Sequence, residues 1–146
     1  MTRSTVIPGA SSRLEKLATW QLSQASARAH RVLHERLAKA GASGYDYRIL
    51  AVLGDLGPIC QADLGRAAVL DRRDVTHTVR SLQARELVSR RLDPRDGRQT
   101  LVELTAAGSS TLERLDLVLD EVQTEVLAGF TAAQRRTLLS LLKRLA

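Results

Sequence analysis

The fold is decided by the stretch Leu87-Val88-Ser89-Arg90-Arg91-Leu92-Asp93-Pro94-Arg95-Asp96-Gly97-Arg98-Gln99-Thr100-Leu101-Val102-Glu103-Leu104-Thr105. Two short runs of alternating apolar and polar residues flank a tip rich in turn formers, which predicts a β-hairpin. Pro94 fixes φ for the second position of a tight turn, and Gly97 can supply a positive φ. The hairpin is also strongly basic. Arg90 and Arg91 lie on its first arm, and Arg95 and Arg98 lie at its tip.

Upstream of this hairpin the sequence predicts two short helices joined by a tight turn. The first runs from Ile59 to Ala68, and the second from Arg72 to about Glu86 with Asp71 as its N-cap. The second helix buries Val75, Val79 and Leu82, and we expect its other face to present Arg72, Arg73, Thr76, His77, Thr78 and Arg80. A helix pair whose second member is basic on its free face is what a reader of the DNA major groove requires. Together with the hairpin, the pattern predicts a winged helix-turn-helix.

Long helices are expected on both sides of this unit. Ser12 to about Lys39 contains no Pro or Gly, and Ser12 with Glu15 suggests a capping box. A short buried helix, residues 45–54, follows. After the hairpin, a heptad seam (Leu112, Leu115, Leu119, Val122 and Val126) has its partner in this chain or in another. Thr131 and Gln134 suggest a second capping box before a leucine-faced terminal helix, typical of a dimer element.

The expected architecture is mainly α with a small β-hairpin wing. We expect one domain, residues 1–146, in which residues 12–40 and 106–146 are dimerisation helices and residues 45–105 form the winged unit. Residues 1–11 are expected to be a frayed tail.

Composition bounds the class of protein. The 146 residues carry a formal charge of +6, which fits a polyanionic partner. The single cysteine allows no intrachain disulfide and favours a reducing, cytoplasmic setting. No apolar run approaches the roughly 20 residues that span a bilayer, and the N-terminus lacks a signal-peptide core. There is no phosphate-binding loop, catalytic triad or paired-carboxylate pattern, so we expect neither an enzyme nor a cofactor.

Three blocks of this sequence resemble the MarR family of bacterial transcriptional regulators. Gln61-Ala62-Asp63-Leu64-Gly65-Arg66-Ala67 resembles the first helix of that family's pair, and Asp71 through Arg91 its recognition helix and first wing strand. Asp93-x-Arg95-Asp96-x-Arg98 followed by Leu104-Thr105-x-x-Gly108 resembles the wing signature. The resemblance implies a homodimer with intertwined terminal helices, whose two winged units straddle a pseudo-palindromic operator in double-stranded DNA.

The resemblance also implies a small effector. Relatives often bind aromatic or phenolic molecules between the dimer helices and the winged unit. The residues from the corresponding segments are Trp20, Tyr45, Asp46, Tyr47 and Arg48, for which ordinary core packing is the alternative. The implied function is a ligand-responsive repressor.

Two positions depart from the family pattern. Glu86 stands where the family often has Gly, so Glu86 must adopt a left-handed conformation or the helix must end differently. His77 stands where Arg is frequent, which leaves the base preference at that position open.

Several alternatives remain open on the sequence alone. Arg95 and Arg98 either enter a narrow minor groove or pair with Asp93 and Asp96. The basic helix face either binds DNA or is solvated, with Asp71 and Asp74 neutralising the first two arginines. His30 and His34 have the spacing of two metal ligands, and Cys60 is a candidate redox sensor. The rival functions are therefore a helical scaffold that binds no DNA, and a metal- or redox-gated sensor of the same fold.

Overall fold

The computed structural model describes Gly9 and residues 11–146 of the chain. Its elements are α1 (Ser12–Glu15), α2 (Ala18–Lys39), α3 (Gly44–Leu56), β1 (Ile59–Cys60), α4 (Gln61–Ala68), α5 (Arg72–Ala84), β2 (Val88–Leu92), β3 (Thr100–Leu104), α6 (Ala106–Val126) and α7 (Ala132–Lys143). The predicted class, mainly α with a small β-hairpin, is confirmed. The tail prediction falls almost entirely outside the described residues.

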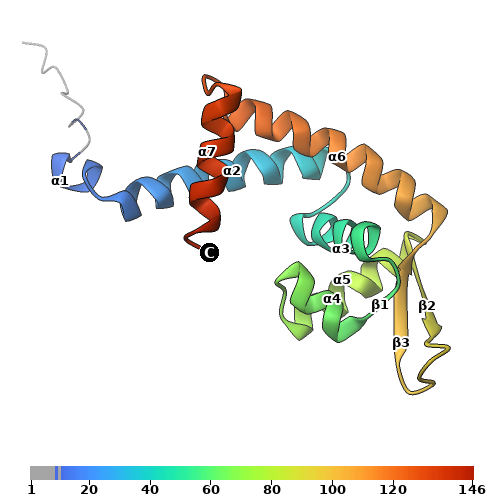
Figure 1. Ribbon diagram of the computed structural model, residues 1–146. Helices are drawn as coiled ribbons and strands as arrows, with labels where there is room; N and C mark the ends of the chain where they lie inside the picture. The colour runs from blue at the N-terminus through green and yellow to red at the C-terminus, as the bar shows by residue number, and fades with distance from the viewer. Residues whose placement is uncertain (1–8, 10) are drawn as a thin grey trace, which may run out of the picture.

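Figure 1 shows a compact lobe, made of α3, α4, α5 and the sheet, beside an arm made of α2, α6 and α7. The lobe closes around Leu50, Leu64, Val79 and Leu82, none of which exposes any of its surface. Leu115 of α6 joins the same core, so the arm and the lobe share one apolar interior. None of the described helices is long and apolar enough to cross a membrane.

The sheet has three antiparallel strands in the order β1-β3-β2. The predicted hairpin is confirmed: Val88 faces Leu104 and Leu92 faces Thr100. The prediction that Ile59 and Cys60 begin the first helix of the pair is wrong: they form the third strand, β1, which pairs with β3 (Ile59 with Val102). The pairing partner lies more than 40 residues further along the chain, so no local pattern indicates this strand.

Of the two capping boxes predicted at helix starts, one is present and the other is not. The Thr131–Gln134 capping box is present in both directions. The Ser12–Glu15 box is wrong, because α1 starts after Ser11 without any side-chain cap. Leu17 then takes an extended conformation, so the predicted single helix is divided into α1 and α2. No side chain of α1 is buried, and a hydrogen bond from Gln21 Nε2 to the Glu15 carbonyl, at 3.1 Å, links α1 to α2.

The arm is held together within the chain. Leu115 and Val122 of the predicted heptad seam are buried, and α6 packs against α2 and α3. Arg36 of α2 reaches Glu121 at 2.9 Å and Glu125 at 2.8 Å on α6. The seam therefore finds at least part of its partner in the same chain. By contrast α7, which crosses the arm in Figure 1, buries none of its residues.

Candidate nucleic-acid interface

Helix α5 presents the predicted basic face. Its N-cap Asp71 accepts a hydrogen bond from the Asp74 amide at 2.8 Å, which fixes where the helix begins. A shallow hollow of about 510 Å³ lies over the exposed side and is lined by Arg72, Arg73, Thr76, His77 and Arg80. In the described part of the chain, neither Asp71 nor Asp74 forms an ion pair with Arg72 or Arg73. The neutralisation considered from the sequence is therefore absent there.

Thr78 does not belong to this face. It is buried, with 4% of its surface exposed, and it lies among Val75, Val79 and Leu82. The physical reason is helical spacing: Thr78 is three residues after Val75, which puts it on the buried side of the helix. The prediction that Thr78 faces outward is wrong.

The aspartates of the wing tip shape its backbone. Asp93 Oδ1 accepts a hydrogen bond from the Arg95 amide at 2.8 Å, and Asp96 Oδ1 accepts one from the Arg98 amide at 3.1 Å. The Asp93 amide also donates to the Gln99 carbonyl at 2.9 Å, which closes the loop. The expected positive φ at Gly97 is absent. The loop conformation is therefore stabilised by hydrogen bonds from backbone amides to the Asp93 and Asp96 carboxylates.

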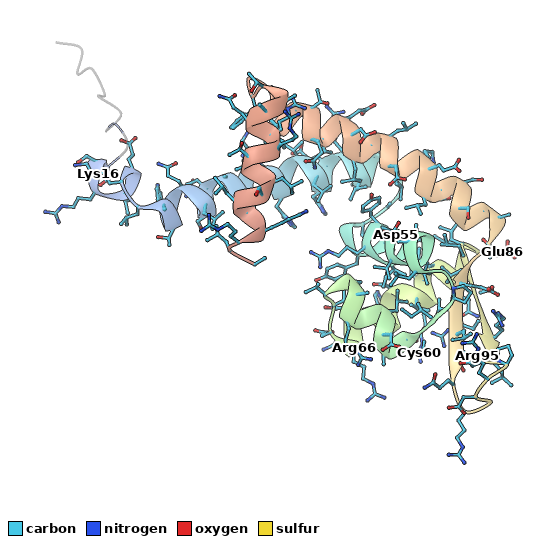
Figure 2. All side chains as sticks on the ribbon, in the orientation of Figure 1. Lys16, Asp55, Cys60, Arg66, Glu86 and Arg95 are labelled. Carbon is cyan, nitrogen blue, oxygen red and sulfur yellow. The ribbon has the colours of Figure 1, made fainter. Side chains whose placement is uncertain are left out.

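The arginines of the tip are consequently left without carboxylate partners. Neither Arg95 nor Arg98 forms an ion pair with any residue that the structure describes. The same holds, within those limits, for Arg72, Arg73 and Arg80. Figure 2 places Arg95 at the end of the compact lobe that lies far from α2 and α7. Five unneutralised guanidinium groups per chain thus come from two neighbouring elements of one lobe.

The turns that aim these elements contain two strained residues. Glu86 has φ +59°, the left-handed conformation anticipated from its place after the recognition helix. Its carbonyl accepts a hydrogen bond from the Thr105 hydroxyl at 2.7 Å, which fastens the helix end to the start of α6. Val69, between α4 and α5, also has a positive φ of 55°. Sequence reasoning missed Val69, because a β-branched residue is among the least suited to that conformation.

A polar bridge that the sequence did not reveal connects three elements of the interface. Gln61 Nε2 donates to the Thr76 hydroxyl at 2.8 Å, and Arg90 donates to Gln61 Oε1 at 3.3 Å. The bridge joins α4, α5 and β2. No local pattern in the sequence signals it, since its members lie 15 and 29 residues from Gln61.

Asp46, one of the five candidate effector residues, is engaged inside the lobe. It is 7% exposed and forms a capping box with Ser43. It also accepts a hydrogen bond from Arg85 at 2.9 Å. Its carboxylate therefore joins the start of α3 to the end of α5, which corresponds to the core-packing alternative for this residue.

The remaining effector candidates lie on two helices. Trp20 belongs to α2 and is 37% exposed, while Tyr45, Tyr47 and Arg48 belong to α3. The Arg48 guanidinium lies over the Tyr45 ring, 5.8 Å from its centre. Burial and the hydrogen bond that Tyr47 donates to Asp116, at 2.8 Å, raise the pKa of Tyr47 to about 12.

The metal and redox candidates each have local partners. The rings of His30 and His34 stack with their centres 6.4 Å apart. The described residues contain no group of three or more His, Cys, Asp or Glu side chains arranged to hold a metal ion. The Cys60 thiol donates to Asp63 at 3.2 Å, and this hydrogen bond together with Arg66 lowers the pKa of Asp63.

Comparison with known proteins identifies the family. A family model described as the MarR family matches residues 40–99. The crystal structure of a probable transcriptional regulator from Pseudomonas aeruginosa is 32% identical, with a TM-score of 0.82, and the match covers 92% of this chain and 100% of that one. The chain belongs to the MarR family.

Other known proteins match over a smaller share of this chain or at lower identity. The transcriptional repressor NicR of Pseudomonas putida is 33% identical over 96 residues, which are 66% of this chain and 61% of NicR. The matched regions span 60–64% of the length of the curated relatives. BpsR of Bordetella bronchiseptica is 24% identical, with a TM-score of 0.77, and the match covers 86% of this chain and 95% of BpsR. This similarity shows that the two chains share a fold. As a MarR-family transcriptional regulator, the chain is not an enzyme, as the sequence predicted.

Proposed function

We propose that the protein is a sequence-specific regulator that binds double-stranded DNA as a homodimer. Helix α5 enters the major groove, and the β2–β3 wing reaches the adjacent minor groove. The observation that carries the proposal is the set of five arginines without carboxylate partners among the described residues. They are Arg72, Arg73 and Arg80 on α5, with Arg95 and Arg98 on the wing. Thr76 and His77 lie on the same helix face.

The proposal of a homodimer draws support from apolar surface on the arm. Leu139, Leu141 and Leu145 of the C-terminal segment are 56%, 50% and 71% exposed, and Leu17 is 50% exposed at the other end of the chain. Single chains rarely leave so many large apolar side chains in solvent along the same elements. We propose that residues 12–40 and 106–146 of two chains cover one another, which leaves residues 45–105 of each as the winged unit.

We further propose that the regulator is a repressor whose DNA binding responds to a small aromatic or phenolic molecule. NicR is described as a repressor, and the DNA binding of BpsR is described as regulated by 6-hydroxynicotinic acid. The proposed effector contacts are Trp20 on α2 of the arm and Tyr45, Tyr47 and Arg48 on α3 of the lobe. An effector would act by favouring a dimer whose two α5 helices no longer match the operator spacing. We place this activity in the cytoplasm, where chromosomal DNA is accessible.

Binding to the DNA upstream of the protein's own gene, measured against salt concentration, tests the proposal. If all five arginines of each protomer contacted phosphates, the logarithm of the affinity would fall with the logarithm of salt at a slope of about −9 for the dimer. A shallower but still steep slope is expected, because some arginines read bases. A helical scaffold that binds no DNA would give no specific complex at any salt concentration. Light scattering on the same sample should give the mass of two chains.

The gated-sensor alternative is tested on the same complex. Metal analysis of the purified protein addresses the His30–His34 pair. Oxidant is then added to the DNA complexes of wild type and of Cys60→Ser. If oxidant releases the wild type from DNA but not the variant, the thiol gates binding, and the proposed response to an aromatic effector has to be revised.

A further inference from the structure

Two neighbouring arginines of the wing point to opposite faces of the sheet. Side chains alternate along a strand, so Arg90 shares a face with Val88, and Arg91 lies on the other. Val88 is 2% exposed and faces the core. In register, Arg90 lies beside Val102, which is itself 1% exposed. Arg90 therefore emerges on the face of the wing that is turned toward α4 and α5.

The two arginines also differ in how their charge is balanced. Arg91 Nε donates to Glu103 Oε1 at 3.1 Å, an ion pair across the strands. Arg90 instead donates to a neutral amide oxygen of Gln61, at 3.3 Å. Among the residues that the structure covers, no carboxylate pairs with Arg90. Glu103 therefore neutralises the charge of Arg91. The Arg90 guanidinium is held in place by a neutral group, and its charge is not neutralised.

Gln61 uses both ends of its amide to hold this arrangement. Its Nε2 donates to the Thr76 hydroxyl on α5 at 2.8 Å, and that hydroxyl donates in turn to the Arg72 carbonyl at 2.8 Å. Its Oε1 is then turned toward Arg90 on β2. Gln61 is only half-buried, yet it fixes Arg90 relative to the first turn of the recognition helix.

We propose that Arg90 binds a phosphate of the DNA strand that separates the groove entered by α5 from the groove entered by the wing, and that Gln61 positions it. Any duplex that receives both elements must pass its backbone between them, along the face from which Arg90 emerges. A guanidinium group has five N–H donors, and the Gln61 contact uses one, so the rest remain for phosphate oxygens. Gln61 touches no DNA in this scheme and acts through Arg90. The inference rests on the proposed function.

The same network narrows the role of Thr76. Its hydroxyl hydrogen is committed to the Arg72 carbonyl, and one lone pair accepts from Gln61. Thr76 therefore offers DNA its methyl group and at most one acceptor. In this scheme Thr76 can contact a thymine methyl or a base donor, but not a base acceptor.

The test compares Arg90 with its neighbour on the opposite face. Arg90→Ala, Arg90→Gln and Arg91→Gln dimers are titrated with the specific duplex and with an unrelated duplex at several salt concentrations. Arg91→Gln removes the same charge one residue away and leaves Glu103 unpaired, so any bias in the comparison works against the proposal. Thermal unfolding of each variant verifies the fold, and Arg90→Gln keeps the test valid if Arg90→Ala folds poorly.

We expect Arg90→Gln to lower the affinity for both duplexes by at least about tenfold. The dependence of affinity on salt should become less steep by about 2 for the dimer, since two phosphate contacts are lost. Arg91→Gln should stay within about twofold of wild type. Equal effects of the two substitutions would overturn the proposal. Failure of the wild type to bind any duplex would overturn the proposed function and the inference with it.

A double-mutant cycle tests the positioning role of Gln61. Gln61→Ala should weaken DNA binding in the wild-type background but have no further effect in Arg90→Gln, because both substitutions remove the same phosphate contact. A purely structural role for Gln61 would weaken binding equally in the two backgrounds, and that result would overturn the assignment.

Discussion

Gly108 is the position at which one added methyl group should most disturb the contact between α6 and the base of the wing. A Cβ at residue 108 would lie 1.9 Å from the Leu87 carbonyl oxygen and 3.3 Å from Leu104 Cδ2. The clash is with backbone, so no rotamer change relieves it. The Leu87 oxygen also accepts the Thr105 amide at 3.1 Å, which joins the base of the wing to the start of α6. Gly108→Ala must therefore move α6 away from the wing by about 1 Å to reach an ordinary contact.

Two opposing terms set the size of the effect. Alanine stabilises a helix by about 1 kcal/mol relative to glycine. Overpacking costs about 3 kcal/mol at the upper end of its usual range, and a lost hydrogen bond costs about 1 kcal/mol. The free energy of unfolding should fall by about 2–3 kcal/mol, which corresponds to a drop of roughly 5–10 °C in melting temperature.

Thermal and urea unfolding of the dimer at fixed concentration measure this change. Gly44→Ala, at the first turn of α3, is the matched control, because its Cβ would meet nothing within 4 Å. It should leave stability unchanged or raise it by up to about 1 kcal/mol. If Gly108→Ala were as stable as Gly44→Ala, the close approach of α6 to the wing would be refuted.

Three further outcomes are expected. Arg98→Ala should weaken operator binding by more than about tenfold while the dimer persists, and unchanged affinity in a binding titration would mean that this side chain touches no DNA. Val69→Gly should raise the free energy of unfolding by about 0.5–1 kcal/mol, because relief of left-handed strain exceeds the added entropy of the unfolded chain; a loss of stability in urea would contradict this. The pKa of Tyr47 is about 12 in the folded chain, above its ordinary 10.0, so the stability linked to its neutral form is complete below pH 10 and is lost as pH rises toward 12. Ultraviolet titration in a Tyr45→Phe background should follow Tyr47 alone, and Asp116→Asn should lower its pKa; an unshifted titration would show that the hydrogen bond is absent.

Local chemistry made the winged unit predictable from sequence. The hairpin, the helix pair and the Thr131 capping box each depend on residues a few positions apart, and each is present. The left-handed Glu86 was one of two alternatives that followed from the glycine that the MarR family often has at this position. These features are encoded over short distances, where turn and capping preferences act directly.

Interactions between distant residues were not predictable. Asp46 was a candidate effector contact with core packing as the alternative, and its carboxylate pairs with Arg85, 39 residues away. Asp93 and Asp96 were weighed as ion-pair partners for the tip arginines, yet they bind backbone amides. Each outcome depends on tertiary geometry that a linear pattern of charges does not contain.

Hydroxyl-radical footprinting of the dimer on the DNA upstream of its own gene tests the central claim most directly, since it reports where each protomer lies along the duplex. The account predicts two protected half-sites about one helical turn apart, roughly 10 bp, on one face of the duplex. Each should be flanked by minor-groove protection that disappears when Arg95 and Arg98 are both replaced by alanine. Protection of a single half-site, or flanking protection that survives this double substitution, would contradict the account.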